Sequence, residues 1–166
     1  MIRALLLDLD DTLLDNSMES FLPAYFDKLS THLAPLVHPE ILIPQLLAST
    51  RVMMENEDPR RTLEQTFSDD FFAALDIDHE IGSALIEEFY LSVFPSLRAL
   101  TNQRPAAIEL VNKALDRSLD VAIATNPLFP LKAIEHRLEW AGFDPVNTPF
   151  AFIPSYESFH FAKPRM

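Results

Sequence analysis

Three aspartates follow a short apolar run at the start of the chain. Asp8, Asp10 and Asp11 come directly after residues 2–7. Carboxylates packed this closely repel one another unless a cation offsets their charge, so the spacing predicts a metal site. Their hard oxygen atoms suit Mg²⁺, which binds through one or two carboxylates and keeps waters that a phosphate can replace. Because side chains alternate along a strand, we expect Asp8 and Asp10 on the same side of the chain.

The same run allows two other interpretations. It could be a strand that ends in an acidic turn without any chemistry. Oxygen-bearing side chains also fall at four ligand positions of a calcium-binding EF-hand loop, namely Asp8, Asp10, Thr12 and Glu19. That loop needs glycine at its sharp turn, where this chain has Leu13, so we favour the magnesium site.

The elements around the aspartates predict an α/β protein with a parallel sheet. Apolar runs of strand length recur along the chain, as in strands that are buried on both faces. We expect strands at Ile2–Leu7, Val121–Ala124 and Phe150–Ile153, and helices at Ala106–Arg117 and Leu131–Trp140, the last ended by Gly142. This order is typical of a parallel sheet with a helical insertion after its first strand. Such sheets bind ligands at the carboxyl ends of their strands.

The long stretch from Ser17 to about Val93 has a helical pattern. Apolar residues recur at helical spacing in two places, which are Phe21, Tyr25, Leu29 and Leu33, and then Ile81, Leu85, Ile86, Phe89 and Tyr90. Prolines divide the region into about four helices, with breaks at Pro35, Pro39, Pro59 and Pro95. Asp78 is expected to cap the start of one of them.

Composition and charge exclude several classes of function. The chain of 166 residues has no cysteine, which excludes disulfides, thiolate zinc sites and a cysteine nucleophile. Its net charge is −12, and residues 15–100 hold 15 acidic against 5 basic side chains, which argues against nucleic acid and membrane surfaces as partners. No apolar stretch reaches about 20 residues, and the N-terminal run is too short for a signal peptide, so we expect a cytoplasmic protein.

The run Asp8-Leu9-Asp10-Asp11-Thr12-Leu13 resembles the first motif of the haloacid dehalogenase-like (HAD-like) hydrolases, D-x-D-x-T-L after an apolar strand. The resemblance implies that Asp8 is the nucleophile that becomes an aspartyl-phosphate and that Asp10 is the general acid and base. It also places Mg²⁺ on the Asp8 side chain and the Asp10 main-chain carbonyl. No such chemistry is implied for Asp11 and Leu13, which we take as structural.

Two later segments resemble the second and third motifs of the same superfamily. Thr125-Asn126 ends the second strand of the expected sheet, and Lys163-Pro164 follows the third. The resemblance implies that the Thr125 hydroxyl and the Asn126 backbone N–H hold the phosphoryl group, and that Lys163 offsets its charge. Taken alone, Thr125-Asn126 is a turn and Lys163 is a solvated cation. Their order after the first motif favours the functional interpretation.

The resemblance also implies a domain organisation. Residues 1–14 and 101–166 would form a Rossmann-like HAD core, and residues 15–100 an inserted all-helical cap that chooses substrates. Arg51, Arg60 and Arg61 could meet an anionic substrate group, although pairing with nearby acidic residues is the simpler expectation. His32, His38 and His79 are expected as surface or cap residues and not as ligands.

The expected function is a Mg²⁺-dependent phosphatase that acts on a small phosphorylated metabolite. Asp10 favours a phosphatase over a dehalogenase, which protonates no alkoxide leaving group, while a phosphomutase would use the same residues. The alternative from another class is a catalytically incomplete binding or assembly protein.

The superfamily's fourth motif, an acidic pair after a fourth strand, does not occur in this chain. We therefore expect a fragment with impaired activity and weak Mg²⁺ binding, in which residues 2–7 form an exposed apolar sheet edge. A second polypeptide or a further C-terminal segment would complete that sheet.

Overall fold

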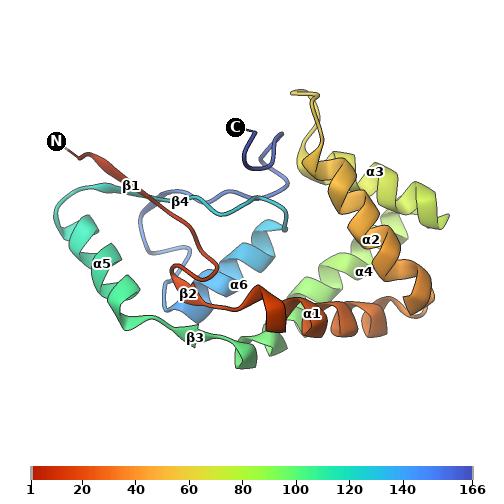
Figure 1. The fold of residues 1–166 in the computed structure, drawn as a ribbon, viewed down its shortest axis with the longest axis horizontal. Coiled ribbons are helices and arrows are strands. Elements are labelled where there is room, and N and C mark those ends of the chain that lie inside the picture. The colour runs from red at the N-terminus through yellow and green to blue at the C-terminus, as the bar shows by residue number, and fades with distance from the viewer. Residues whose placement is uncertain (1, 166) are drawn as a thin grey trace.

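The structure, a computed structural model, describes residues 2–165 and has an α/β architecture (Figure 1). Its parallel sheet has the order β1-β4-β5, with β1 at Ala4–Leu7, β4 at Asp120–Ile123 and β5 at Phe150–Phe152. Strand β1 pairs with β4 in register from Ala4 opposite Asp120 to Leu7 opposite Ile123. The predicted α/β class, the parallel sheet and the three predicted strands are thus confirmed, the strands to within a few residues at their ends.

Two helices accompany the sheet at the positions that the sequence predicts. Helix α5 spans Pro105–Asp116, and helix α6 spans Leu131–Ala141. Gly142 ends α6 with φ of +97°, a left-handed conformation that glycine adopts without strain. Helix α6 turns Ala133, Ile134 and Leu138 into the core, where all three are buried.

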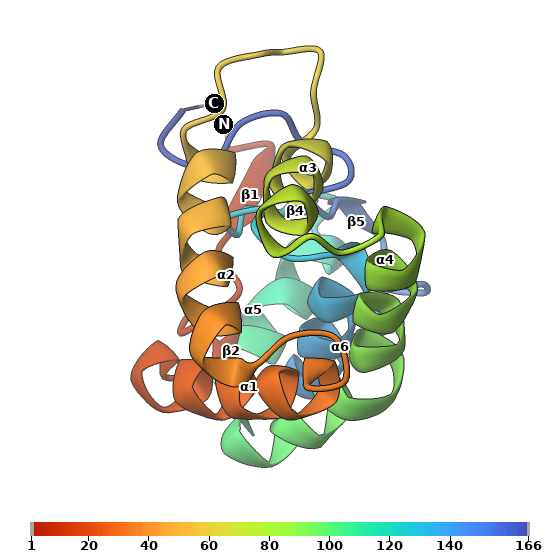
Figure 2. The ribbon, with the colours of Figure 1, turned by 90° about the vertical axis from the view of Figure 1, so that its right-hand side faces the viewer.

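The region between β1 and α5 forms a block of helices, which we call the helical block. It contains α1 (Met18–Leu33), α2 (Pro39–Met54), α3 (Leu63–Leu75) and α4 (His79–Glu88), followed by a π-helical turn η1 (Phe89–Val93) and a 3₁₀ segment η2 (Phe94–Leu100). Figure 2 views the molecule from the side of this block, with the sheet behind it. The four predicted helices are confirmed, and the Asp78 carboxylate caps α4 by accepting the N–H groups of Glu80 and Ile81.

One expectation for helix α4 is wrong. The helical pattern places Ile81 on the apolar face, but its side chain is 57% exposed. The buried residue in the first turn of α4 is Gly82, which packs directly against the Phe72 ring and leaves no room there for a side chain. The face of α4 that meets the core in this turn is therefore one residue, about 100°, away from the predicted one.

The helical block shares one hydrophobic core with helix α6. Phe21 of α1 packs edge-on against Phe94 of η2, with ring centroids 6.1 Å apart. Phe94 stacks in turn on Trp140 of α6, with ring centroids 5.3 Å apart. These rings fix one end of the block to the strand-and-helix part of the chain.

The chain enters and leaves the helical block through two paired segments. Strand β2 (Leu14–Asp15) pairs antiparallel with β3 (Asn102–Gln103), next to the predicted boundary between core and cap. Arg104 makes ion pairs with both Asp11 and Asp15 on the entering segment, the second at 3.1 Å. The two segments by which the chain enters and leaves the helical block therefore lie side by side.

Strand β1 is less buried than the sequence predicts. Leu6 is 70% exposed, whereas Leu5 and Leu7 on the opposite face pack against the core, so only one face of the strand is covered. Strand β1 is also the outer strand of the sheet, with no partner strand on its free side among residues 2–165. The expectation that the first strand is buried on both faces is wrong, whereas the expected exposed apolar edge is present. No helix within residues 2–165 is long and apolar enough to cross a membrane.

Candidate functional site

The site begins where strand β1 ends. Asp8 is the first residue after Leu7, at the carboxyl end of the strand. Its Oδ1 atom lies 3.7 Å from the Nζ atom of Lys163, and both side chains are partly exposed, at 48% and 34%. A carboxylate and an ammonium group from opposite ends of the chain thus meet at one edge of the sheet.

The segment after strand β4 completes this arrangement. The Ala124 N–H donates to the Leu7 carbonyl at 2.8 Å, which sets residues 124–126 beside the end of β1. The Asn126 side-chain oxygen accepts the Lys163 backbone N–H at 3.0 Å. Thr125 is only 6% exposed, and its hydroxyl makes no hydrogen bond with residues 2–165. The structure therefore brings together Asp8, Asn126 and Lys163, with Thr125 next to them in the chain.

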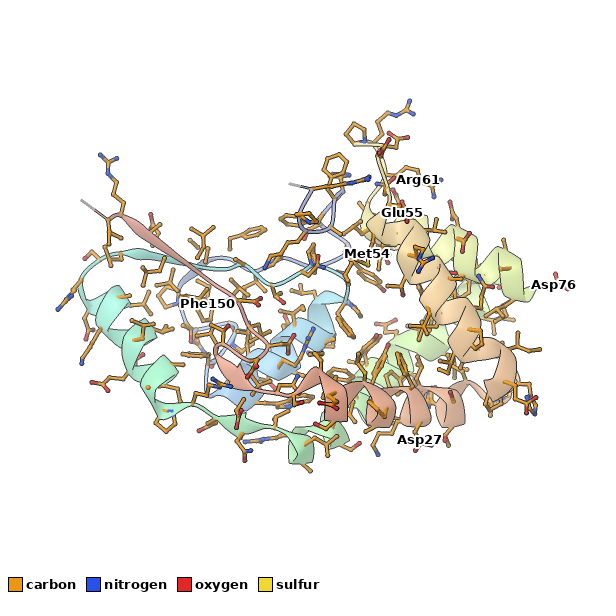
Figure 3. The ribbon with its side chains drawn as sticks, viewed as in Figure 1. Asp27, Met54, Glu55, Arg61, Asp76 and Phe150 are labelled. Atoms are coloured by element: carbon orange, nitrogen blue, oxygen red, sulfur yellow. The ribbon has the colours of Figure 1, made fainter. Side chains whose placement is uncertain are left out.

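The segment that carries Lys163 is anchored on the helical block. The Asn56 side chain donates to the His160 carbonyl at 2.8 Å, and His160 Nδ1 lies 2.9 Å from the Arg61 carbonyl oxygen. Arg165 forms an ion pair with Glu57 at 3.0 Å. Figure 3 labels Glu55 and Arg61 on the α2–α3 connection, close to the C-terminal segment. Residues 55–61 therefore help to position Lys163.

The Asp10 carboxylate has its own set of partners. Its Oδ1 atom accepts the Asn16 side-chain N–H at 2.9 Å, and its Oδ2 atom accepts an Arg137 N–H at 2.6 Å. Strand β1 ends at Leu7, so the alternation of strand side chains does not set how Asp8 and Asp10 lie relative to each other. The two carboxylates bind different partners, Asp8 the lysine and Asp10 the arginine and the amide.

Arg137 is a buried cation that the sequence pattern did not reveal. Its side chain is 1% exposed, its Nε atom donates to the Ala133 carbonyl at 3.2 Å, and its guanidinium carbon lies 4.4 Å from the centroid of the Phe129 ring. Its Nη2 atom makes no hydrogen bond within residues 2–165. A buried charge needs a partner, and the Asp10 carboxylate supplies it. The available signal was the helical spacing, because Arg137 interrupts an otherwise apolar face of α6 between Ala133 and Ala141.

Four other residues named from the sequence have structural contacts. Asp11 has φ of +57° and pairs with Arg104, and Leu13 is 1% exposed in the core. Arg60 binds the Asp58 carboxylate at 2.8 Å, and this hydrogen-bonded contact lowers the pKa of Asp58 to about 2. Arg61 pairs with Asp69. The simpler expectation, pairing with acidic neighbours, therefore holds for both arginines of the α2–α3 connection.

The two carboxylates differ in their fit to a magnesium ion. Asp8 fits as one carboxylate ligand, since about half of its side chain is exposed and Lys163 is its one charged partner within residues 2–165. The Asp10 side chain does not fit as a second ligand, because Asn16 and Arg137 occupy its two oxygens. Residues 2–165 contain no group of three or more His, Asp or Glu side chains that could enclose a metal. The donors present suit a weakly held ion that keeps most of its waters.

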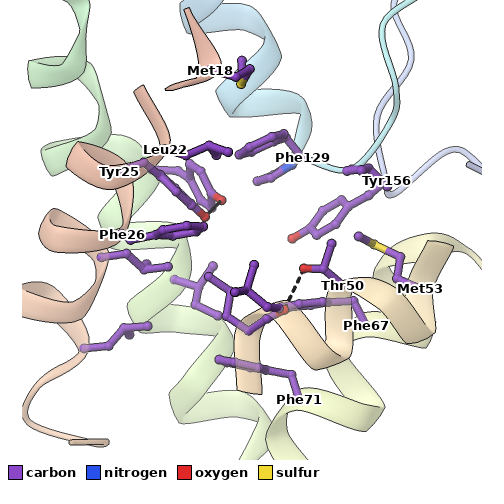
Figure 4. A pocket seen from close by; sticks show the side chains of 18 residues that line it. Met18, Leu22, Tyr25, Phe26, Thr50, Met53, Phe67, Phe71, Phe129 and Tyr156 are labelled. Atoms are coloured by element: carbon purple, nitrogen blue, oxygen red, sulfur yellow. Dashed lines mark hydrogen bonds between the residues drawn. The ribbon is translucent and has the colours of Figure 1, made fainter. Parts of the chain in front are cut away.

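An apolar cavity lies next to these residues, between the helical block and the turn that follows Asn126. Its volume is about 300 Å³, and its walls come from helices α1 to α4, the π-helical turn η1 and residues 128–130 and 156 (Figure 4). All three tyrosines of the protein, Tyr25, Tyr90 and Tyr156, line it. The hydroxyls of Tyr25 and Tyr90 bond to each other at 2.9 Å.

The burial of these tyrosines predicts that the protein loses stability at alkaline pH. Burial raises the pKa of Tyr25 to about 12, and it also raises the pKa values of Tyr90 and Tyr156 above their ordinary range. In the unfolded chain each phenol ionises near pH 10, so the stability is intact below about pH 10 and falls as the pH rises toward the folded values. The ionisation of Tyr25 alone should lower the free energy of unfolding by roughly 2–3 kcal/mol by about pH 12.

We expect the ultraviolet absorbance of tyrosinate to rise only together with the loss of helical circular dichroism. A rise of tyrosinate near pH 10 in a protein that keeps its native circular dichroism would contradict the buried positions of the three phenols.

Comparison with known proteins identifies no relative. No protein-family model, no curated protein and no solved structure matches the chain significantly. The functional interpretation thus depends on the residues that the fold gathers at the end of β1.

Proposed function

We propose that this protein is a Mg²⁺-dependent phosphomonoester hydrolase of the HAD-like type, acting through an aspartyl-phosphate on Asp8. The observation that carries the proposal is the meeting of Asp8, Asn126 and Lys163, which lie far apart in the sequence, at the carboxyl end of the sheet. That edge is where open α/β sheets bind ligands. A carboxylate nucleophile beside a lysine and an unengaged threonine hydroxyl suits phosphoryl transfer.

The residues of the site account for each proton transferred and each bond made or broken in both halves of the reaction. In the first half, an Asp8 oxygen attacks phosphorus, the ester P–O bond breaks, and Asp10 gives a proton to the leaving oxygen. In the second half, water attacks the aspartyl-phosphate, Asp10 takes one of its protons, and the bond to Asp8 breaks to release phosphate. Lys163 and the Thr125 hydroxyl stabilise the charge on the phosphoryl oxygens.

The contacts of Asp10 bear on both halves of the reaction. Its Oδ2 atom accepts an N–H of Arg137 at 2.6 Å, and a proton on that oxygen would face this donor. The protonated form of Asp10 starts the first half and is formed in the second half. Both halves therefore require the contact between Asp10 and Arg137 to lengthen.

The Asp8 carboxylate and the Asp10 main-chain carbonyl would hold the magnesium ion. When bound, Mg²⁺ would offset the repulsion between the Asp8 carboxylate and the incoming phosphate. With few donors for the ion, we expect weak binding and slow turnover by the 166-residue chain.

An assay with a chromogenic phosphomonoester tests this function. We expect slow phosphate release that needs added Mg²⁺, stops with EDTA and returns when Mg²⁺ exceeds the chelator. CaCl₂ in place of MgCl₂ is the control, since calcium favours more ligands and longer bonds than this site offers. Hydrolysis at the same rate with and without EDTA would contradict the proposed role of the metal. No hydrolysis at saturating Mg²⁺ would contradict the proposed phosphatase activity.

A binding protein of the same fold is the second candidate, and the Asp10 contacts favour it over a phosphomutase or a dehalogenase. A carboxylate held by Arg137 and Asn16 in all conformations could not protonate a leaving group. Such a protein would still bind inorganic phosphate near Lys163. Calorimetric phosphate binding without turnover would identify it.

A further inference from the structure

We propose that the apolar cavity between the helical block and residues 128–130 binds the aromatic body of the phosphomonoester substrate. This inference rests on the proposed function and names its substrate class. Three properties of the cavity support it, which are its closeness to the site, the chemistry of its walls and its size.

The cavity adjoins the site through two short connections. Phe129 lines the cavity, and its ring contacts the guanidinium group of Arg137, which binds Asp10. On the other side, Asn16 binds Asp10, and Met18, two residues further on, lines the cavity. The carboxylate that would protonate the leaving oxygen is therefore separated from the cavity by one guanidinium group and one ring. A leaving group attached to a phosphate near Asp8 would extend toward this space.

The walls of the cavity suit an apolar ligand. No charged side chain of residues 2–165 lines it, and its polar side chains are largely engaged with one another or with the backbone. Tyr25 and Tyr90 share a hydrogen bond, and the Thr50 hydroxyl donates to the Leu46 carbonyl at 2.7 Å. A sugar or a nucleobase would leave several of its own polar groups without partners here, which is costly. An aromatic or aliphatic body would not.

The aromatic rings on the walls favour an aromatic ligand over an aliphatic one. Figure 4 shows Tyr25 and Phe26 on one side of the cavity, with Tyr156 across from them. The Phe129 ring packs edge-on against Tyr25, with ring centroids 5.7 Å apart. A ligand ring that packs edge-on or offset against aromatic walls gains more binding free energy than its buried area alone provides. The Tyr156 hydroxyl points into the cavity and makes no hydrogen bond with residues 2–165, so it can bind one polar substituent.

The volume sets the size of the ligand. An apolar cavity of about 150 Å³ holds one benzene ring. The cavity here is about 300 Å³, which is room for two fused rings. A substrate with a naphthyl-sized body on a short alkyl phosphate would fill the cavity and reach the site.

The test compares naphthylethyl phosphate with hydroxyethyl phosphate, because both release a primary alkoxide and differ mainly in the body of the alcohol. We expect kcat/KM to favour naphthylethyl phosphate by roughly 100-fold. The variant Leu22→Trp puts a larger side chain at the cavity wall and should reduce that preference by about 10-fold or more. The matched control, Leu110→Trp, makes the same change on the half-exposed outer face of helix α5 and should leave the preference as it is.

Binding of naphthylethanol, measured by calorimetry, separates the cavity from the chemistry. Leu47→Trp, on a lining residue that is 53% exposed, replaces Leu22→Trp if the latter fails to fold. Naphthylethanol that binds the wild type and not the variant, without hydrolysis of either phosphate, would support the cavity assignment and overturn the phosphatase. Equal kcat/KM for the two phosphates would overturn the cavity assignment alone. If naphthylethanol does not bind and neither phosphate is hydrolysed, both the cavity assignment and the phosphatase are overturned.

Discussion

Replacing Asp8 by asparagine is expected to lower kcat for a phosphomonoester by about 10³-fold or more. Asparagine has nearly the same shape, but it carries no charge and cannot form the acyl phosphate. It also leaves Lys163 without its partner at 3.7 Å. Phosphate release by the purified variant, at the Mg²⁺ concentration that saturates the wild type, gives the measurement.

Asp11→Asn is the matched control for this result. Asp11 lies three residues along the same turn, binds Arg104 and has no assigned chemistry. Asparagine tolerates its left-handed backbone angle of +57°, so the local structure should persist. We expect kcat within about 3-fold of the wild type, since only a surface ion pair is lost. Equal losses in the two variants would mean that Asp8 is one of several acidic residues in a turn and not the nucleophile.

Replacing Arg137 by methionine is expected to lower the free energy of unfolding by about 3 kcal/mol, because it breaks a buried charge pair. Asp10, with 17% of its side chain exposed, would lose its cation, and Phe129 would lose the guanidinium group against its ring. Methionine fills part of the volume, so the loss comes from the charge and less from a cavity. Urea denaturation, followed by circular dichroism, measures it.

The control for Arg137 is Arg165→Met, which removes an arginine from an exposed ion pair with Glu57. That pair is screened by water, so the loss should stay below about 1 kcal/mol. Adding Asp10→Asn to Arg137→Met should recover part of the lost stability, since no unpaired carboxylate is left in the double variant. If the urea midpoint of Arg137→Met equals that of the wild type, Asp10 does not depend on this arginine to offset its charge.

Much of the fold follows from the sequence because its signals are local. Apolar runs of four to six residues mark the three strands, Gly142 marks the end of α6, and Asp78 marks the start of α4. The first two strands bring Asp8 and Thr125 to the same edge of the sheet, and this placement is a property of parallel sheets in general. The closeness of Asp8 and residues 125–126 could be expected on these grounds, whereas the position of Lys163 also depends on the contacts that residues 55–61 make with the C-terminal segment.

The contacts of Asp10 could not be predicted in the same way. They depend on the packing of helix α6 against the turn after β1, a contact between residues more than a hundred positions apart. Arg137 lies on the buried face of α6, where a periodic pattern predicts an apolar residue, and only the fold reveals which carboxylate offsets its charge. The exposure of Leu6 depends on whether anything covers the second face of the sheet, and the apolar run itself carries no information on that.

Trapping the aspartyl-phosphate tests the role of Asp8 without relying on turnover. Acetyl phosphate can phosphorylate Asp8 without a proton from Asp10, because acetate needs no protonation to leave, while Asp10→Asn should slow the hydrolysis of the product. We expect Asp10→Asn protein, quenched in acid after acetyl phosphate and Mg²⁺, to carry one phosphoryl group on the peptide that contains Asp8. The group should be absent with EDTA and in the Asp8→Asn/Asp10→Asn double variant. A phosphoryl group that persists in the double variant, or none in the single variant at saturating Mg²⁺, would contradict the role of Asp8.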